Sequence, residues 1–187
     1  MPANKILYFV AIVPPESIAK DITLLKEEIA ERYETTAALK SPPHITLIPP
    51  FSFDPIKEPF LEEVLIESPK IPTGLHFILQ GIGSFGQKVI YIKVSQNKVL
   101  TEYQKKMESN FYEKTNLKAS LNKNNGFTPH LTLALRDLKP EAFFEIMNRY
   151  KQNDFYYEFE AKSFHLLKHH GSSGWKIFKE FELTQGS

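Results

Sequence analysis

The 187-residue sequence predicts an α+β fold made of two similar halves related by a pseudo-twofold axis. A five-residue phrase occurs twice, as Pro-His-Ile-Thr-Leu at 43–47 and as Pro-His-Leu-Thr-Leu at 129–133, an offset of 86 residues. The segments around each copy follow the same order: strand, helix, motif strand, helix and strand. A motif that repeats together with its neighbouring elements indicates an internal duplication, and a twofold relation would bring both copies to one cleft.

The first repeat begins with an apolar run at 5–13, which is typical of a short buried strand. The prolines at 14–15 end this run and suit the first turn of a helix. Apolar residues then recur at helical spacing and predict an amphipathic helix to about residue 33; they are Ile18, Ile22, Leu25 and Ile29.

The first motif lies in an expected strand at 43–48. We expect the prolines at 49–50 to end it, because proline cannot donate a hydrogen bond to a sheet. Apolar residues at 60–65 predict a short helix, and alternation at 75–80 predicts a further strand. The glycines within 81–86 indicate a turn-rich junction between the repeats.

The second repeat has the same order, and a hairpin follows it. Its expected elements are a strand at 88–94, a helix at 100–111, a loop at 115–126, the motif strand at 129–133, a helix at 140–147, a strand at 155–161 and a hairpin of strands 164–168 and 175–183. No Gly/Ser-rich linker separates the halves. We therefore expect residues 1–187 to form a single bilobal domain, with the first repeat at about 5–84 and the second at about 85–187.

Composition narrows the function classes. An apolar fraction of 42%, with 15 Phe and 8 Tyr, predicts a packed globular protein. The net charge of +1 lacks the basic excess of a general nucleic-acid coat, so any nucleic-acid partner is expected to be small or held at one end. The absence of cysteine excludes disulfides, thiol nucleophiles and the usual zinc-finger ligand sets. We expect a cytoplasmic monomer without a membrane or stable protein partner.

The motif itself predicts chemistry. Side chains at i and i+2 of a strand point to the same face, so each copy presents one imidazole beside one hydroxyl. Histidine titrates near neutrality, so one imidazole can take a proton while the other gives one. A threonine hydroxyl can donate to a phosphate oxygen that gains charge in the transition state. Two such pairs would suffice for phosphoryl transfer without a metal or cofactor.

The doubled motif resembles that of the 2H phosphoesterase superfamily, and within it the bacterial 2'-5' RNA ligase-like proteins, also called RNA 2',3'-cyclic phosphodiesterases. The likeness covers nearly the whole chain: the opening strand with its Pro-led helix, both motifs, and the closing strand from Trp175. It implies two α+β lobes whose antiparallel sheets line a central cleft, with helices outside. It also implies that His44 and His130 are the catalytic acid–base pair, and that Thr46 and Thr132 bind the substrate phosphate.

One departure from the family pattern concerns an arginine. Many relatives carry an arginine a few residues after the second motif, following Leu-Ala or Leu-Gly. Here the run is Leu-Ala-Leu-Arg at 133–136, one residue longer. A shift by one residue turns a strand side chain to the other face, which argues against Arg136 as a phosphate ligand.

Four further residues are candidate substrate contacts, each with a plainer alternative. Phe51 and Phe127 flank the motifs and could stack on a base, although core packing is the default for a phenylalanine. Trp175 is either a base platform or a strand anchor. His165 either lines the cleft or is a partly buried structural histidine. Its neighbours at 169–170 lack a carboxylate at a spacing that would complete a metal site.

The expected substrate is a nucleotide or RNA 3'-end that carries a 2',3'-cyclic phosphate, which water opens to a 2'-phosphate. Reversible 2'-5' RNA ligation uses the same groups. Two alternatives remain: hydrolysis of a small ADP-ribose-type cyclic phosphate, and a non-catalytic protein that binds nucleotides or RNA ends. The sequence does not assign the acid and base roles between the two histidines.

Overall fold

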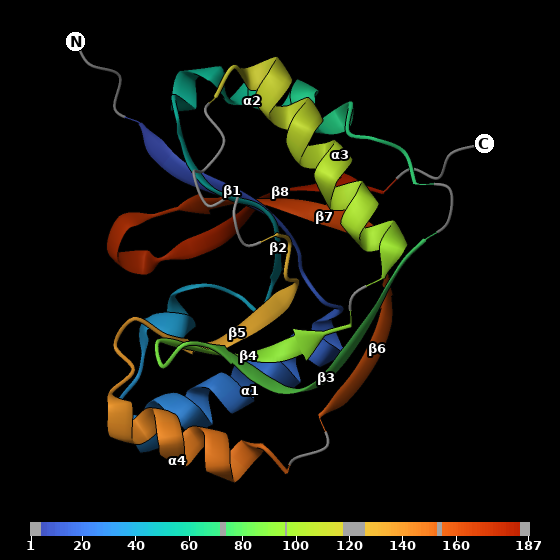
Figure 1. Ribbon diagram of the computed structural model, residues 1–187. Coiled ribbons are helices and arrows are strands. Elements are labelled where there is room, and N and C mark those ends of the chain that lie inside the picture. The colour runs from blue at the N-terminus through green and yellow to red at the C-terminus, as the bar shows by residue number, and fades with distance from the viewer. Residues whose placement is uncertain (1–4, 72–73, 96, 118–125, 153–154, 184–187) are drawn as a thin grey trace.

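The computed structural model describes residues 5–71, 74–95, 97–117, 126–152 and 155–183. In these segments the first repeat contains β1 (Ile6–Ile12), α1 (Glu16–Tyr33), β2 (Ile45–Phe53), α2 (Glu58–Ile66) and β3 (Leu75–Phe85). The second contains β4 (Val89–Val94), α3 (Lys98–Thr115), β5 (His130–Leu135), α4 (Pro140–Tyr150) and β6 (Tyr156–Ala161), followed by the hairpin β7 (Ser163–His169) and β8 (Trp175–Glu182). The predicted α+β class and the repeated element order are confirmed (Figure 1). The middle of the expected loop, 118–125, lies outside the described residues.

The eight strands form one antiparallel sheet in the order β6-β3-β4-β5-β2-β1-β7-β8. We expected two sheets, and the sheet does divide into two four-stranded parts, one for each lobe. They are joined by a short pairing of β2 with β5, in which Ile45 lies opposite Leu131. A sequence pattern identifies strands but not their partners across a twofold axis, so this junction was not predictable.

The prediction that prolines end the first motif strand was wrong, because β2 continues through them to Phe53. Val10 pairs with Ile48 and Tyr8 pairs with Phe51, so Pro49 and Pro50 together face one residue of β1. This is a β-bulge, where a strand carries an extra residue outside the regular ladder. Proline is tolerated at a bulge because no ladder hydrogen bond is required there.

The first helix of each repeat crosses to the opposite lobe. Figure 1 shows α2 and α3 together above the sheet, and α1 and α4 together below it. Helix α1 follows β1 but meets α4, where Tyr150 Oη donates to Glu28 Oε1 at 2.8 Å. Helix α3 follows β4 but meets β2, where Gln104 Nε2 donates to the Leu47 carbonyl at 3.0 Å. Each lobe is therefore built from both repeats.

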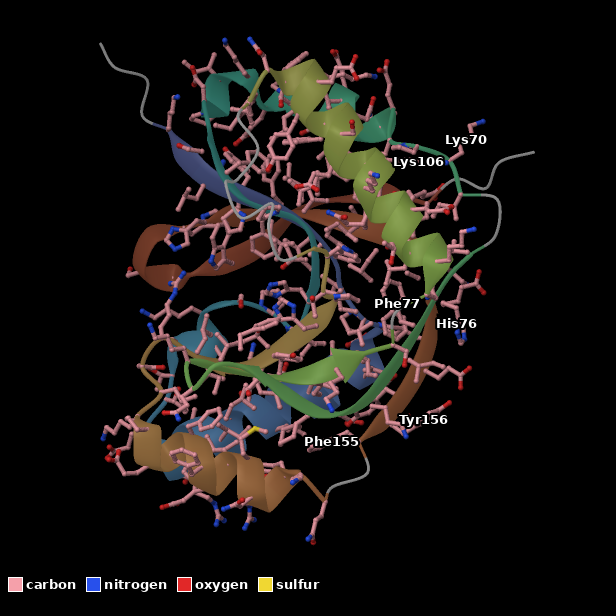
Figure 2. The ribbon with its side chains drawn as sticks, in the orientation of Figure 1. Lys70, His76, Phe77, Lys106, Phe155 and Tyr156 are labelled. Atoms are coloured by element: carbon pink, nitrogen blue, oxygen red, sulfur yellow. The ribbon has the colours of Figure 1, made fainter. Side chains whose placement is uncertain are left out.

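The two faces of the sheet are packed differently. The main core lies between the sheet and the helices; Phe77, for example, is fully buried and stacks on Phe159 at 5.1 Å. Figure 2 shows His76 and Tyr156 at the outer edge of the β3–β6 pair, on its solvent side. The opposite face carries a smaller cluster of Phe9, Ala11 and Leu167, against which Trp175 packs. None of the helices in the described segments is long and apolar enough to cross a membrane.

Candidate active site

The sheet register brings the two motifs together. Because Ile45 pairs with Leu131, continuing the antiparallel register places His44 opposite Thr132 and Thr46 opposite His130. Directly opposed residues share a face, and their Cβ atoms lie about 4.5–5.5 Å apart. The four polar side chains therefore form a compact square on one face of the sheet. Ile45 and Leu131 point to the other face, where both are fully buried.

Both histidines are oriented by the same hydrogen bond. His44 Nδ1 lies 2.7 Å from the Pro42 carbonyl oxygen, and His130 Nδ1 lies 2.8 Å from that of Thr128. A carbonyl oxygen only accepts, so Nδ1 carries the proton in both rings. Nε2 is consequently the nitrogen that titrates in each. The duplication has kept the carbonyl two residues before the histidine in both copies, and this fixes the tautomer as well as the ring position.

His44 lies in an enclosed and positively charged environment. Its ring packs against Phe9, with a centroid separation of 4.7 Å. Burial lowers the pKa of His44 to about 4, and the positive charges of Lys26 and His130 act in the same direction, while the Pro42 hydrogen bond opposes them. In the free protein His44 is therefore neutral at physiological pH.

His130 lies at the more open side of the square. Its ring contacts Phe85 at 4.8 Å and Tyr91 at 5.2 Å. Burial lowers the pKa of His130 from its ordinary value, and the hydrogen bond to Thr128 partly opposes this. Tyr91 fits here because it lies opposite Gly83: a Cβ atom on Gly83 would lie 2.8 Å from the tyrosine ring.

A buried lysine supports the first motif. Lys26 of α1 is only 3% exposed, and its Nζ donates to the Ser41 carbonyl at 2.7 Å. The following two residues are prolines, which have no N–H of their own to fix this turn. Lys26 thus holds the segment whose next carbonyl, that of Pro42, orients His44. Burial lowers the pKa of Lys26 to about 8.

A lysine also lies beside the second motif, but unlike Lys26 it is exposed. Lys93 of β4 is exposed and pairs with His130 across the strands, so it lies on the same face as the square. Lys26 therefore acts on the first motif from a buried position, whereas the lysine beside the second motif is exposed to solvent.

The structure separates the four additional candidates. Phe51 is 7% exposed and packs on Phe111 in the main core, so the prediction that it contacts substrate was wrong: its side chain lies on the helix side of the sheet, away from the motif side chains. Phe127 is half-buried and packs against the same core. Trp175 lies on the cleft face, 4.7 Å from Phe9.

His165 also lies on the cleft face, because it pairs with Ala11, which in turn pairs with Thr46. It is 9% exposed, and its buried Nδ1 has no hydrogen-bond partner among the described residues. Burial lowers the pKa of His165, and Glu180 opposes the shift. The histidine borders a pocket of about 380 Å³, and other residues that line it include Val13, Pro14, Pro15, Ser163 and Glu180.

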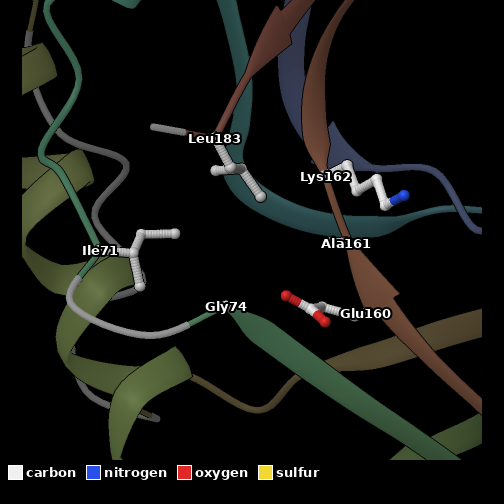
Figure 3. A pocket seen from close by; sticks show the side chains of 6 residues that line it. All are labelled: Ile71, Gly74, Glu160, Ala161, Lys162 and Leu183. Atoms are coloured by element: carbon white, nitrogen blue, oxygen red, sulfur yellow. The ribbon is translucent and has the colours of Figure 1, made fainter. Parts of the chain in front are cut away.

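A second pocket lies away from the motifs, at the ends of β3, β6 and β8. It measures about 240 Å³ and is lined by Ile71, Gly74, Glu160, Ala161, Lys162 and Leu183 (Figure 3). The Glu160 carboxylate lies over Gly74, where a Cβ atom would be 1.9 Å from Oε1. None of the predicted site residues lines this pocket, and we assign no role to it.

Arg136 follows β5, is exposed and adopts a left-handed backbone conformation with φ of 63°. Its neighbour Asp137 ties this end of β5 to the segment after α1, because its carboxylate accepts from Thr35 Oγ1 at 2.7 Å and from the Ala37 amide at 3.0 Å. The turn therefore has a structural role. Within the described part of the chain, no group of three or more His, Asp or Glu side chains is arranged to hold a metal ion.

Sequence reasoning missed five residues around the square: Phe9, Lys26, Phe85, Tyr91 and Lys93. Lys26 had a visible signal, since it lies on the apolar stripe of α1, four residues after Ile22 and three before Ile29. A lysine at a core position of an amphipathic helix is unusual and calls for a reason. The three aromatic residues had no such signal, because their contacts depend on strand register.

Proteins with similar sequences and similar folds point to one family. The family model of the 2'-5' RNA ligase superfamily matches residues 14–173. A protein of Bacillus thuringiensis (strain Al Hakam), named "Putative phosphoesterase", is 33% identical over 163 residues, which cover 85% of this chain and 88% of that one.

Two solved structures of E. coli LigT share the fold. The complex with 3'-AMP has a TM-score of 0.68 and 20% sequence identity, and covers 97% of this chain and 100% of that chain. The complex with NADP+ has a TM-score of 0.66 and 19% sequence identity, and the match covers 97% of this chain and 99% of that chain.

Proposed function

The chain belongs to the 2'-5' RNA ligase superfamily and is a phosphoesterase of the 2H type, and we propose that its substrate is a 2',3'-cyclic phosphate on a nucleotide or RNA end. The product would be the 2'-phosphate. In this proposal His44 and His130 form the acid–base pair, and Thr46 and Thr132 donate to the phosphate oxygens.

One observation carries the proposal: the register that places each histidine opposite the threonine of the other motif. With Nδ1 bound to a carbonyl in both rings, both Nε2 atoms remain for proton transfer. A phosphate held between them would meet a proton acceptor on one side, a proton donor on the other, and two hydroxyl groups. General acid–base catalysis of this kind contributes roughly 10²–10⁴-fold.

The reaction balances with these groups alone. One neutral histidine takes a proton from water, whose oxygen attacks phosphorus and forms a new P–O bond. The P–O3' bond breaks, and the second histidine, in its protonated form, gives its proton to O3'. The two threonine hydroxyls donate to the non-bridging oxygens, where charge accumulates. A 5'-hydroxyl in place of water would give a 2'-5' linkage by the same steps.

The depressed histidine pKa values imply that substrate and proton bind together. Both rings favour the neutral form in the free protein, whereas the reaction requires one to be protonated. A bound phosphate raises the pKa of a neighbouring imidazole, because its negative charge stabilises the cation. Binding should thus take up a proton, and phosphate affinity should rise as the pH falls from 7 toward the free-state pKa of His44.

The direct test is turnover of 2',3'-cyclic nucleotides in EDTA, with the product identified as 2'- or 3'-phosphate. We expect a 2'-phosphate, and a loss of at least about 100-fold in kcat for both His44→Ala and His130→Ala. His76→Ala is the matched control, because His76 is exposed and lies 3.0 Å from Glu158, outside the cleft. Undiminished turnover in either active-site variant would exclude the paired mechanism.

Nucleotide chemistry is favoured over other phosphate esters by the aromatic residues beside both histidines. LigT, which shares the fold, has been crystallised with 3'-AMP and with NADP+. A small cyclic phosphate of the ADP-ribose type remains the second candidate. A panel of cyclic phosphates with and without a base would distinguish them, since a substrate chosen for its base loses affinity when the base is removed.

A further inference from the structure

We propose that the cleft holds two nucleobases, one on each side of the phosphate, with Trp175 as the platform beside His44 and Phe85 as the platform beside His130. The inference rests on the proposed function and extends it to the substrate class. It requires a substrate in which two nucleosides share one phosphate, as in a dinucleoside linkage.

The platform beside His44 is a chain of aromatic contacts. The ring centroids of Phe9 and His44 are 4.7 Å apart. The centroids of Phe9 and Trp175 are also 4.7 Å apart, and the planes of these two rings form an angle of 72°. The His169 ring also contacts Trp175, with a centroid separation of 4.8 Å. Phe9 is 3% exposed and belongs to the base of the cleft, whereas Trp175 is half-buried and so keeps ring surface for a ligand.

Gly174 explains why Trp175 is held in place. A Cβ atom there would lie 2.2 Å from the Lys40 carbonyl oxygen, and its φ is +72°, so the hairpin approaches the segment before the first motif too closely for a side chain. This contact fixes the start of β8, and with it the tryptophan, next to the first motif.

The platform beside His130 is more open. Phe85 is 40% exposed, lies 4.8 Å from His130 at 87°, and lies 4.5 Å from Tyr91. An apolar ring of this size beside a phosphate-binding histidine leaves hydrophobic surface in water when the site is empty. A base that stacks on it removes that surface, and every base has a flat face that suits the ring.

The strand order places the platforms on opposite sides. Phe85 is on β3 and Tyr91 on β4, next to His130 on β5; Phe9 is on β1 and Trp175 on β8, beyond His44 on β2. A mononucleotide held between the histidines has one base and can occupy one platform. Two nucleosides joined through the phosphate occupy both.

The test uses three probes: inorganic phosphate, a nucleoside 2'-monophosphate and a 2'-5'-linked dinucleoside monophosphate. Their dissociation constants are measured by calorimetry for Phe85→Leu, Trp175→Leu and the control Phe60→Leu, whose side chain is 42% exposed on α2. Each platform variant should weaken dinucleoside binding roughly 5- to 100-fold. One of the two should weaken mononucleotide binding, and neither should alter phosphate binding.

The outcomes separate the inference from the proposed function. Equal affinity for the two nucleotide probes in the unaltered protein, or no effect of one platform variant on the dinucleoside, overturns the two-base inference while phosphate binding still supports the site. Weaker phosphate binding in Phe85→Leu or Trp175→Leu also overturns it, because the ring would then act by holding a histidine; an NMR titration of His44 and His130 checks this directly. Failure of all three probes to bind counts against both proposals.

Discussion

The two motif sites have the same polar atoms in different surroundings. Around His44 the chain is closed: Phe9 covers the ring and the buried Lys26 supports the preceding turn. Around His130 it is open: Phe85 is 40% exposed, and Lys93 lies in solvent. Both imidazoles nonetheless bind a carbonyl two residues earlier. Duplication has kept the groups that position the titrating nitrogen, whereas the groups that set its pKa have diverged.

The largest effect that would test this comparison comes from the threonines, which should be equivalent if the square acts as one unit. We expect Thr46→Val and Thr132→Val each to reduce kcat about 10²–10³-fold, since each removes one donor to the developing negative charge. Steady-state kinetics of the two single variants and the double variant measure this. A tenfold or smaller loss in one of them would show that only one motif binds the phosphate.

A smaller effect is expected when one cause of the difference between the two histidine environments is removed. Burial is the main cause of the low His44 pKa, and Lys26→Met removes a positive charge that lowers it further, so the His44 pKa should rise. NMR titration of the imidazole measures the shift. Lys20→Met, at an exposed position of the same helix, should leave it unchanged. An unmoved His44 pKa in Lys26→Met would remove the lysine from the electrostatics of the site.

Lys26 should also leave a signature in stability against pH. Its pKa is about 8 in the folded protein and about 10.5 when exposed, so between these values the unfolded chain binds more protons. The free energy of unfolding therefore gains a rising contribution from this group from pH 8 to about 10.5. Chemical denaturation of Lys26→Met should lack that rise. Because the variant also loses the hydrogen bond to the Ser41 carbonyl, the readout is the pH dependence rather than the stability at pH 7. An equal rise in the variant would exclude Lys26 as its source.

The smallest effect is expected at the open site. Lys93→Gln removes an exposed charge opposite His130 and should weaken phosphate binding about two- to fivefold at low salt, with the difference shrinking as salt screens the charge. Lys88→Gln, exposed in the turn before β4, is the control. The measurement is the dissociation constant for inorganic phosphate at several salt concentrations. A loss of affinity in Lys93→Gln that does not depend on salt would contradict an electrostatic role for Lys93.

The site was predictable where it follows from local geometry. The i, i+2 alternation of a strand places His and Thr on one face in each copy, and the duplication implies that the copies meet. The surroundings were not predictable, because Phe9, Tyr91 and Phe85 approach the histidines through a register that includes bulges in β2 and β5. Phe51 was misassigned because it is close to the motif in sequence, although strand alternation already places it on the face opposite to His44 and Thr46. Lys26 was detectable as a charged residue in an apolar stripe.

The fold shows the same division between local and long-range information. Helix and strand segments follow from periodicity, and their order is as predicted. The exchange of α1 and α3 between the lobes does not follow from periodicity, because either lobe offers an apolar surface of similar character. The prolines after the first motif were expected to end the strand because proline cannot donate a ladder hydrogen bond. That rule holds for regular strands and does not apply at the bulge, where no such bond is required.

The crossing of α1 and α3 has a consequence for how the molecule folds. The segment up to β3 has the strands β1 and β2 but sends its first helix to cover β5, and the segment from β4 onward returns α3 to cover β2. Neither half of the chain can bury its own sheet. We therefore expect the two halves to become ordered together, so that the pair of histidines is assembled only when both halves are folded.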